Sequence, residues 1–306
     1  MDLLYVLEGL RCPALDAFFS LITHFGEETL FIIAGLAFFW CIDKWQGYYL
    51  LAVGLSGTVI NQFLKLACRV PRPWVRDPEF TIVESARAEA TGYSFPSGHT
   101  QSSVGIFAAI ARWNRNRILQ AVCISLCVLV PLSRMYLGVH TPADVGVSLV
   151  IALALVFGLY PVIRRAMQDA HTMRLLLGGM TLLGLAYLIF VTVFPFPADV
   201  DTDNLAHGTK NAFTMLGAIL GVWLTYEVDS RFTRFETDAV WWAQLLKLGL
   251  GLALLLGIKS GLKQPLYMLL GEGYFADGLR YFLMVVFAGC IWPLTFRFFA
   301  KLGKQK

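Results

Sequence analysis

Charged residues are scarce in this chain. Only 15% of its 306 residues are Asp, Glu, Lys or Arg, whereas 57% are hydrophobic, and a soluble domain carries about 25% charged residues. No polar stretch is long enough to form a soluble domain. Apolar windows of about 20 residues recur instead, and that length matches the hydrocarbon thickness of a bilayer. The sequence therefore predicts a polytopic membrane protein.

Other features are also missing. There is no basic patch interleaved with aromatic residues, which argues against nucleic acid as a partner. The six cysteines lack metal-ligand spacing and there is no acidic ligand cluster, so we expect no metal and no other cofactor. Residues 1–26 lack the basic start and small-residue cleavage site of a signal peptide. We interpret them as an amphipathic lead-in at the membrane interface.

The apolar segments predict an all-α bundle of nine transmembrane helices. They cover residues 27–42, 47–68, 98–113, 118–137, 142–163, 174–194, 208–227, 240–260 and 279–300. Residues 27–165 would form the core, and residues 166–306 a C-terminal extension of about four helices. Two glycine pairs, Gly217 with Gly221 and Gly257 with Gly261, have the four-residue spacing that lets helices approach closely.

Loop charges predict an orientation. Basic residues outnumber acidic ones on the side of the C-terminus, where the tail carries Lys301, Lys304 and Lys306. Cytoplasmic loops carry such an excess. Because nine crossings place the termini on opposite sides, we expect a cytoplasmic C-terminus and an N-terminus outside.

Three polar clusters interrupt the apolar pattern. The first is "KLACRVPRP" with Lys65 and Arg72, the second is "FPSGHT" at residues 95–100, and the third is "SRMYLGVHTPAD" at residues 133–144. All three fall on the outer side in the nine-helix arrangement. Their agreement indicates one composite site.

The first chemical signal is a binding site for an oxyanion. Lys65, Arg72 and Arg134 supply three cations, and two guanidinium groups suit a tetrahedral oxyanion. Ser97 and Gly98 stand at a helix start, where free N–H groups and the helix dipole favour an anion. We expect these five residues to form a phosphate site that needs no metal.

The second signal is a pair of histidines. His140 and Asp144 are four residues apart, so at the head of a helix they share one face. A carboxylate bound to one ring nitrogen leaves the other nitrogen as a directed nucleophile. His99 is then available as a general acid toward the leaving oxygen and as a general base toward water.

The motifs K-x6-R-P, P-S-G-H and S-R-x5-H-x3-D follow one another in this order. In this respect the chain resembles the type 2 phosphatidic acid phosphatase superfamily, which includes lipid phosphate phosphatases, glucose-6-phosphatases and vanadium haloperoxidases. The likeness covers roughly residues 20–165, and every motif position matches. It implies a phosphohistidine intermediate on His140, protonation of the leaving group by His99 and orientation of His140 by Asp144. The phosphate would be held by Lys65, Arg72, Ser97, Gly98 and Arg134.

We expect the substrate to be a phosphorylated lipid or an isoprenyl diphosphate, in contact with membrane lipids. The protein would be a multi-pass protein of a bacterial-type plasma membrane with its active site on the extracytoplasmic side. One alternative is a soluble phosphate ester such as a hexose phosphate. The helix layout resembles the nine-helix arrangement of the glucose-6-phosphatases, but this is a likeness in topology and not evidence for a sugar substrate. Another is a catalytically silent lipid-binding or transport protein.

The C-terminal extension carries weaker signals. Lys210 and Asn211 could line a substrate entrance, although they also fit an ordinary interfacial loop. The sequence indicates no particular oligomeric state.

Overall fold

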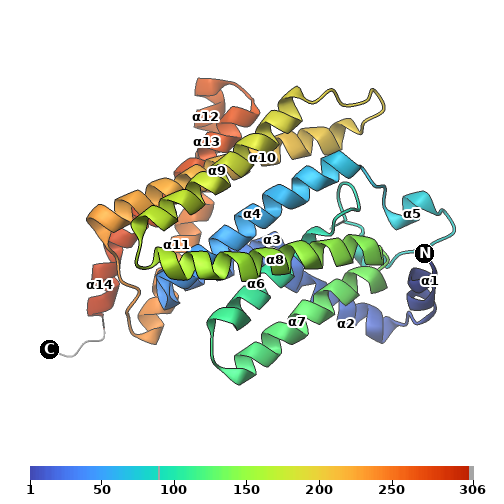
Figure 1. Cartoon of the computed structure of the whole chain (residues 1–306), viewed down its shortest axis with the longest axis horizontal. Helices are drawn as coiled ribbons and strands as arrows, with labels where there is room; N and C mark the ends of the chain where they lie inside the picture. Colours follow the sequence, from blue (N-terminus) through green and yellow to red (C-terminus); the bar gives the residue numbers. More distant parts are fainter. Residues whose placement is uncertain (89, 303–306) are drawn as a thin grey trace. The chain divides into compact units, whose positions relative to one another are not determined.

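A computed structural model describes residues 1–88 and 90–302. Within these residues every regular element is helical (Figure 1), as the sequence predicts. The α-helices are α1 (Asp2–Gly9), α2 (Pro13–Thr23), α3 (Glu28–Ala37), α4 (Lys44–Cys68), α5 (Pro73–Arg76), α6 (Gly98–Trp113), α7 (Arg117–Tyr136), α8 (Pro142–Ala166), α9 (Ala170–Val193), α10 (Thr202–Val228), α11 (Trp241–Gly261), α12 (Lys263–Leu270), α13 (Tyr274–Val286) and α14 (Phe296–Lys301). Short 3-10 and π segments are η1 (His24–Gly26), η2 (Phe38–Ile42), η3 (Glu84–Ala86), η4 (Asp229–Thr233), η5 (Phe287–Ile291) and η6 (Trp292–Thr295).

The predicted number of membrane spans is not confirmed. By length and composition, six helices among the described residues could cross a membrane, or seven if the bent pair Pro13–Gly26 and Glu28–Ile42 is one span. The helix α6 is only 16 residues long, and α10 begins with the polar stretch "TDNLAHGTKN". Neither qualifies as a span. The argument from nine crossings therefore no longer determines which side each terminus occupies.

Several helices begin earlier than their apolar segments because polar residues cap them. The side chain of Asn116 accepts hydrogen bonds from the first turn of α7, and Asp169 and Asp201 do the same for α9 and α10. These caps satisfy N–H groups that a helix start leaves without partners. Hydrophobicity alone places the start of α10 at residue 208, whereas its cap places it at Thr202.

The chain forms two compact units. The first combines Met1–Ile32 with Ala52–Pro161, and the second combines Ile33–Leu51 with the chain from Val162 on. All three polar clusters lie in the first unit. The lead-in, residues 1–26, groups with this unit, whereas much of the first expected apolar helix groups with the second. Lys304 and Lys306, which support the orientation argument, lie outside the described residues.

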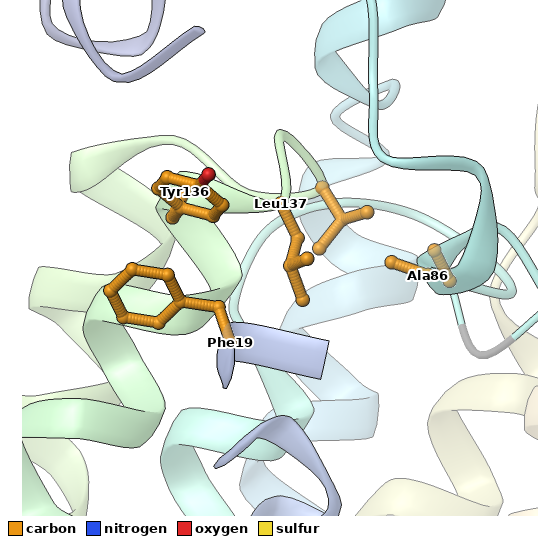
Figure 2. Packing of buried hydrophobic residues seen from close by; sticks show 6 residues of the cluster. Phe19, Ala86, Tyr136 and Leu137 are labelled. Atoms are coloured by element: carbon orange, nitrogen blue, oxygen red, sulfur yellow. The ribbon is translucent and has the colours of Figure 1, made fainter. Parts of the chain in front are cut away.

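An apolar cluster in the first unit holds the connection between α7 and α8. Figure 2 shows the ring of Phe19 from α2 against that of Tyr136, with centroids 4.3 Å apart. Ala86, Leu137 and Val139 complete this part of the cluster. Burying apolar surface here stabilises the segment that leads directly into His140.

Gly138 gives the same connection its turn. Its φ angle is +82°, a conformation that residues with a Cβ atom rarely adopt. A Cβ atom at this position would lie 2.7 Å from the Arg11 guanidinium and 3.0 Å from the Phe80 ring. Arg11 in turn donates a hydrogen bond to the carbonyl oxygen of Tyr136. The N-terminal residues therefore fix the end of α7 and the direction of the chain after it.

In the second unit α10 packs against both α9 and α13. A Cβ atom on Gly217 would overlap the carbonyl oxygen of Gly278, and one on Gly221 would lie 2.7 Å from the Val285 Cβ. The first glycine pair therefore permits close helix contact, as its spacing predicts. The pair Gly257 and Gly261 has no neighbour within 4 Å of either Cβ position, so its spacing has no such role within this unit.

Replacing Gly278 tests the closeness of α10 and α13. In Gly278→Ala the new methyl group would lie 2.8 Å from the Phe213 carbonyl oxygen, and such overpacking costs about 1–3 kcal/mol. We expect a clear drop in the thermal unfolding midpoint of the detergent-solubilised protein. The matched variant Gly257→Ala should leave the midpoint unchanged or raise it, because alanine favours helix. Equal midpoints for the two variants would contradict this packing.

Candidate active site

The ends of α4, α5, α6, α7 and α8 bring the three polar clusters together in the first unit. The positions are Lys65 in the last turn of α4, Arg72 at the N-cap of α5, Ser97 at the N-cap of α6, Arg134 in the last turn of α7 and Asp144 in the first turn of α8. The clusters are joined directly, since the backbone N–H of Ser97 donates to the carbonyl oxygen of Asp144 at 3.1 Å. The fold therefore brings together the residues that the sequence predicts to form one composite site.

His140 is buried between a cation and a carboxylate. Its Nδ1 lies 3.5 Å from Asp144 Oδ2, and its Nε2 lies 2.9 Å from Arg72 Nη1. Only 2% of His140 and 1% of Asp144 is exposed, so bulk water does not compete for either group. This geometry leaves Nε2 facing the cationic side of the site.

Arg72 is held by the backbone on three sides. Its Nε donates to the Gly92 carbonyl oxygen at 3.0 Å, its Nη2 to Thr91 at 2.6 Å, and its Nη1 to Val139 at 2.9 Å. These bonds fix the plane of the guanidinium group beside His140. A phosphate bound beside Arg72 would accept hydrogen bonds from the same guanidinium group that donates to these carbonyl oxygens.

The segment before the P-S-G-H motif also ties the clusters to one another. Lys65 Nζ donates to the Tyr93 carbonyl oxygen at 2.5 Å. The next residue, Ser94, is fully buried and donates its hydroxyl hydrogen to Asp144 Oδ2 at 2.5 Å. The same oxygen accepts the backbone N–H of Thr141 at 2.7 Å. Two donors therefore orient the carboxylate that faces His140.

The P-S-G-H motif starts α6. Ser97 Oγ accepts hydrogen bonds from the backbone N–H and the hydroxyl group of Thr100. The nearest atom to the Cβ position of Gly98 is Asn61 Oδ1, at 3.9 Å, which is an ordinary van der Waals contact. His99 Nε2 is buried and has no hydrogen-bond partner among the described residues. That nitrogen is available to exchange a proton with a substrate.

Arg134 is completely buried at the end of α7. Its Nη1 donates to the hydroxyl oxygen of Thr23 at 2.6 Å, and its carbonyl oxygen accepts the backbone N–H of Val139. A residue of the N-terminal segment thus helps to position a cation of the third motif.

The electrostatics of the site favour a doubly charged anion. Lys65, Arg72 and Arg134 outnumber the single carboxylate of Asp144. Burial lowers the pKa of His140 well below its usual value of 6.5, and the neighbouring cations lower it further. His140 is therefore a neutral imidazole at physiological pH, which is the form that can act as a nucleophile.

The predicted entrance residues lie in the second unit. Lys210 Nζ on α10 is 3.6 Å from Asp277 Oδ2, and Asp277 also forms a 2.6 Å ion pair with Arg280. The role of Lys210 and Asn211 at an entrance stays a prediction. In the part of the chain that the structure describes, no group of three or more His, Cys, Asp or Glu side chains is arranged to hold a metal ion. Metal independence also stays a prediction.

Sequence reasoning missed two residues, Ser94 and Thr23. Ser94 stands only two residues before the P-S-G-H motif, and its position there is the one signal that could have drawn attention to it. Thr23 is 111 residues away from its partner Arg134, and nothing in its local sequence distinguishes it from other helix threonines.

Two family models match the chain. The model of the PAP2 superfamily matches residues 45–168. The model described as "PAP2 superfamily phosphatase, transmembrane extension" matches residues 213–305. The first match contains all three motifs, and the second falls within the C-terminal extension.

The chain belongs to the PAP2 superfamily. Its matches include phosphatidylglycerophosphatase B from Bacillus subtilis, 29% identical over 163 residues, 48% of this chain and 75% of that protein. Undecaprenyl-diphosphatase BcrC from the same organism is 38% identical over 104 residues, 34% of this chain and 51% of that protein. Lipid A 4'-phosphatase from Porphyromonas gingivalis is 28% identical over 159 residues, 50% of this chain and 67% of that protein.

These matches define the class of this PAP2 superfamily member. Its relatives are named phosphatases, so it is a phosphoric ester hydrolase. The transmembrane extension and the apolar helices make it an integral, multi-pass membrane protein. No solved structure matches the chain.

The hydrogen bond from Ser94 to Asp144 can be tested in a phosphatase assay. In Ser94→Ala the carboxylate loses a buried donor that holds it toward His140. Hydrogen bonds to charged groups contribute about 1.5–3 kcal/mol, so we expect kcat to fall roughly tenfold to a hundredfold with little change in KM. Steady-state kinetics on the purified protein measure both constants.

Ser103→Ala is the matched control. Ser103 is also fully buried, but its hydroxyl group donates to the Thr100 carbonyl oxygen of its own helix. Its loss should leave kcat within about twofold of the original value. If Ser94→Ala retained full kcat, the hydroxyl group would not be needed to orient Asp144.

Proposed function

We propose that this protein hydrolyses a lipid phosphate or an isoprenyl diphosphate through a phosphohistidine intermediate on His140. The main support is the buried arrangement of Arg72, His140 and Asp144, with Nε2 of the neutral imidazole on the cationic side. No metal is required by this scheme, because three cations and the start of α6 can neutralise the phosphate.

In the first step, the lone pair of His140 Nε2 attacks phosphorus. The N–P bond forms while the bond from phosphorus to the leaving oxygen breaks, and His99 gives its proton to that oxygen. The hydrogen bond from Arg72 Nη1 must then transfer from Nε2 to a phosphate oxygen. Because Arg72 already lies 2.9 Å from Nε2, this transfer requires little movement.

In the second step, water attacks the phosphohistidine. His99 takes a proton from that water, the N–P bond breaks, and phosphate leaves with His140 neutral again. Throughout both steps Asp144 faces Nδ1, where positive charge develops while Nε2 is bonded to phosphorus. The hydrogen bonds from Ser94 and Thr141 hold the carboxylate in place for this purpose.

A leaving group with a long apolar chain fits the surroundings of this site. The names of the three relatives reported above refer to phosphatidylglycerophosphate, undecaprenyl diphosphate and lipid A, which share a phosphate group attached to an apolar body. We propose that the headgroup reaches the helix ends while the chain stays in the bilayer. The proposal includes a site on the extracytoplasmic side of a bacterial-type plasma membrane, a cytoplasmic C-terminus, and Lys210 and Asn211 near the entrance.

Phosphate release from a panel of substrates tests this function. The panel contains phosphatidic acid, phosphatidylglycerol phosphate, undecaprenyl diphosphate and glucose 6-phosphate. In His140→Ala the nucleophile is absent, and we expect turnover to fall at least about a thousandfold. Release should continue in EDTA, and vanadate should inhibit it because it adopts the geometry of a phosphoryl transition state.

His171→Ala is the control for that experiment. His171 lies on α9 in the second unit and is exposed, so its loss should leave turnover intact. Preference for glucose 6-phosphate would favour a soluble ester instead. If no substrate were turned over while lipid still bound, the protein would be the catalytically silent alternative.

The pKa of His140 predicts the acid side of the pH profile. A histidine whose pKa is lowered stays unprotonated when the pH falls through 6.5, the ordinary histidine value. Burial and the neighbouring cations also lower the pKa of His99, so the fraction of His99 that carries a proton for the leaving oxygen grows as the pH falls. We therefore expect kcat/KM, corrected for the dianionic fraction of the substrate, not to fall between about pH 7 and pH 5.5. A corrected profile that falls by half near pH 6.5 would contradict a neutral, buried His140.

A further inference from the structure

Asn61 is a buried polar side chain that the proposed mechanism does not use. It lies on α4 and is only 3% exposed. Neither its amide oxygen nor its amide nitrogen has a hydrogen-bond partner among the described residues. A buried amide without partners costs free energy, so such a group calls for a physical explanation.

The position of Asn61 relates it to the phosphate site. It precedes Lys65 by four residues, so the two side chains lie on the same face of α4, one turn apart. On the facing helix, the nearest atom to the Cβ position of Gly98 is Asn61 Oδ1, at 3.9 Å. Asn61 therefore lies beside Gly98 at the start of α6, one helical turn from Lys65.

Other contacts between α4 and the segment around α6 agree with this position of Asn61 beside Gly98. One turn before Asn61, a Cβ atom on Gly57 would lie 2.6 Å from the side-chain nitrogen of Gln101. One turn after it, Lys65 reaches the Tyr93 carbonyl oxygen just before the motif. Gln101 thus lies one turn deeper in the helix pair, and Asn61 lies beside the first turn of α6, where Ser97 Oγ caps the backbone N–H of Thr100.

A second group at this helix start also lacks a partner. His99 Nε2 is buried without a hydrogen bond among the described residues, and it follows Gly98 directly in the chain. Two buried polar groups without partners beside one helix start point to a polar ligand at this place. The surrounding charge is positive, so an anion with acceptor oxygens fits best.

We infer that Asn61 is a further phosphate-binding residue, whose amide NH2 group donates a hydrogen bond to a non-bridging oxygen of the phosphoryl group. Either end of the amide can face Gly98, because rotation of the terminal amide group exchanges oxygen and nitrogen. This inference rests on the proposed phosphatase function. It adds a neutral donor from α4 to the cations that the three motifs supply.

A neutral donor at this position has a physical advantage. A fourth buried cation would add to the repulsion among Lys65, Arg72 and Arg134 in the empty site, whereas an amide does not. When phosphate arrives, the amide regains the hydrogen bond that burial removed. Asn61 thus raises affinity for the phosphoryl group without increasing the charge of the empty site.

The inhibition constant of vanadate is the sharpest test, because it does not depend on the amount of active enzyme. Asn61→Leu keeps a side chain of similar size and removes the amide. We expect the vanadate inhibition constant to rise at least about tenfold, together with a fall in kcat/KM. The thermal unfolding midpoint should stay the same or rise, because a buried polar group without partners has been removed.

Gln46→Met is the matched control. Gln46 lies on the same helix about five turns before Lys65, is 1% exposed, and has no partner for either amide atom among the described residues. Its replacement should affect the unfolding midpoint in the same direction as Asn61→Leu. The vanadate inhibition constant should not change.

A second variant covers the case in which Asn61→Leu does not fold. Asn61→Asp retains the size and polarity of the side chain but carries a negative charge, and it should weaken vanadate binding more than Asn61→Leu. An unchanged inhibition constant in either variant would overturn the inference and leave the amide as a partner of a buried water. If the original protein showed no turnover that depends on His140, the proposed function itself would have failed.

Discussion

The fold of the first unit depends on keeping charged groups stable inside an apolar helix bundle. Arg72, Arg134 and Asp144 are almost completely buried, and burial of an unpaired charge is strongly unfavourable. Hydrogen bonds compensate for this burial. Backbone carbonyl oxygens accept them from Arg72, and a hydroxyl group and a backbone N–H donate them to Asp144. The path of the connecting segments follows from these bonds, because carbonyl groups must reach the guanidinium group.

The residues of the candidate active site therefore also have a structural role. The segment from Thr91 to Ser94 supplies acceptors to two cations and a donor to the carboxylate. The turn at Gly138 and the apolar cluster around Leu137 hold the chain that carries His140. Since helix ends leave backbone groups without partners, a meeting point of several ends offers both a polar lining and free N–H groups. This is a physical reason for the proposed anion site to lie at the ends of these helices rather than along their sides.

The second unit follows a different principle. Its helices α10 and α13 approach closely through Gly217, Gly221 and Gly278, which suits a membrane, where packing of small residues replaces the hydrophobic effect. Its buried ion pair of Asp277 and Arg280 satisfies charges locally. The match to a transmembrane extension of PAP2 superfamily phosphatases fits this organisation. The extension thus has its own helix packing and its own polar cluster.

The sequence by itself determined the helical class, most helix positions and the motif residues, because long apolar segments and fixed spacings such as His140 with Asp144 are local properties. The nine membrane spans predicted by the same reasoning are not confirmed, since hydrophobicity along the sequence did not separate α6 and α10 from helices long and apolar enough to span. Only the tertiary structure placed Thr23 on Arg134, Ser94 on Asp144 and Asn61 beside Gly98. Those contacts join residues from separate elements, and neither periodicity nor spacing along the chain predicts contacts between residues so far apart in sequence.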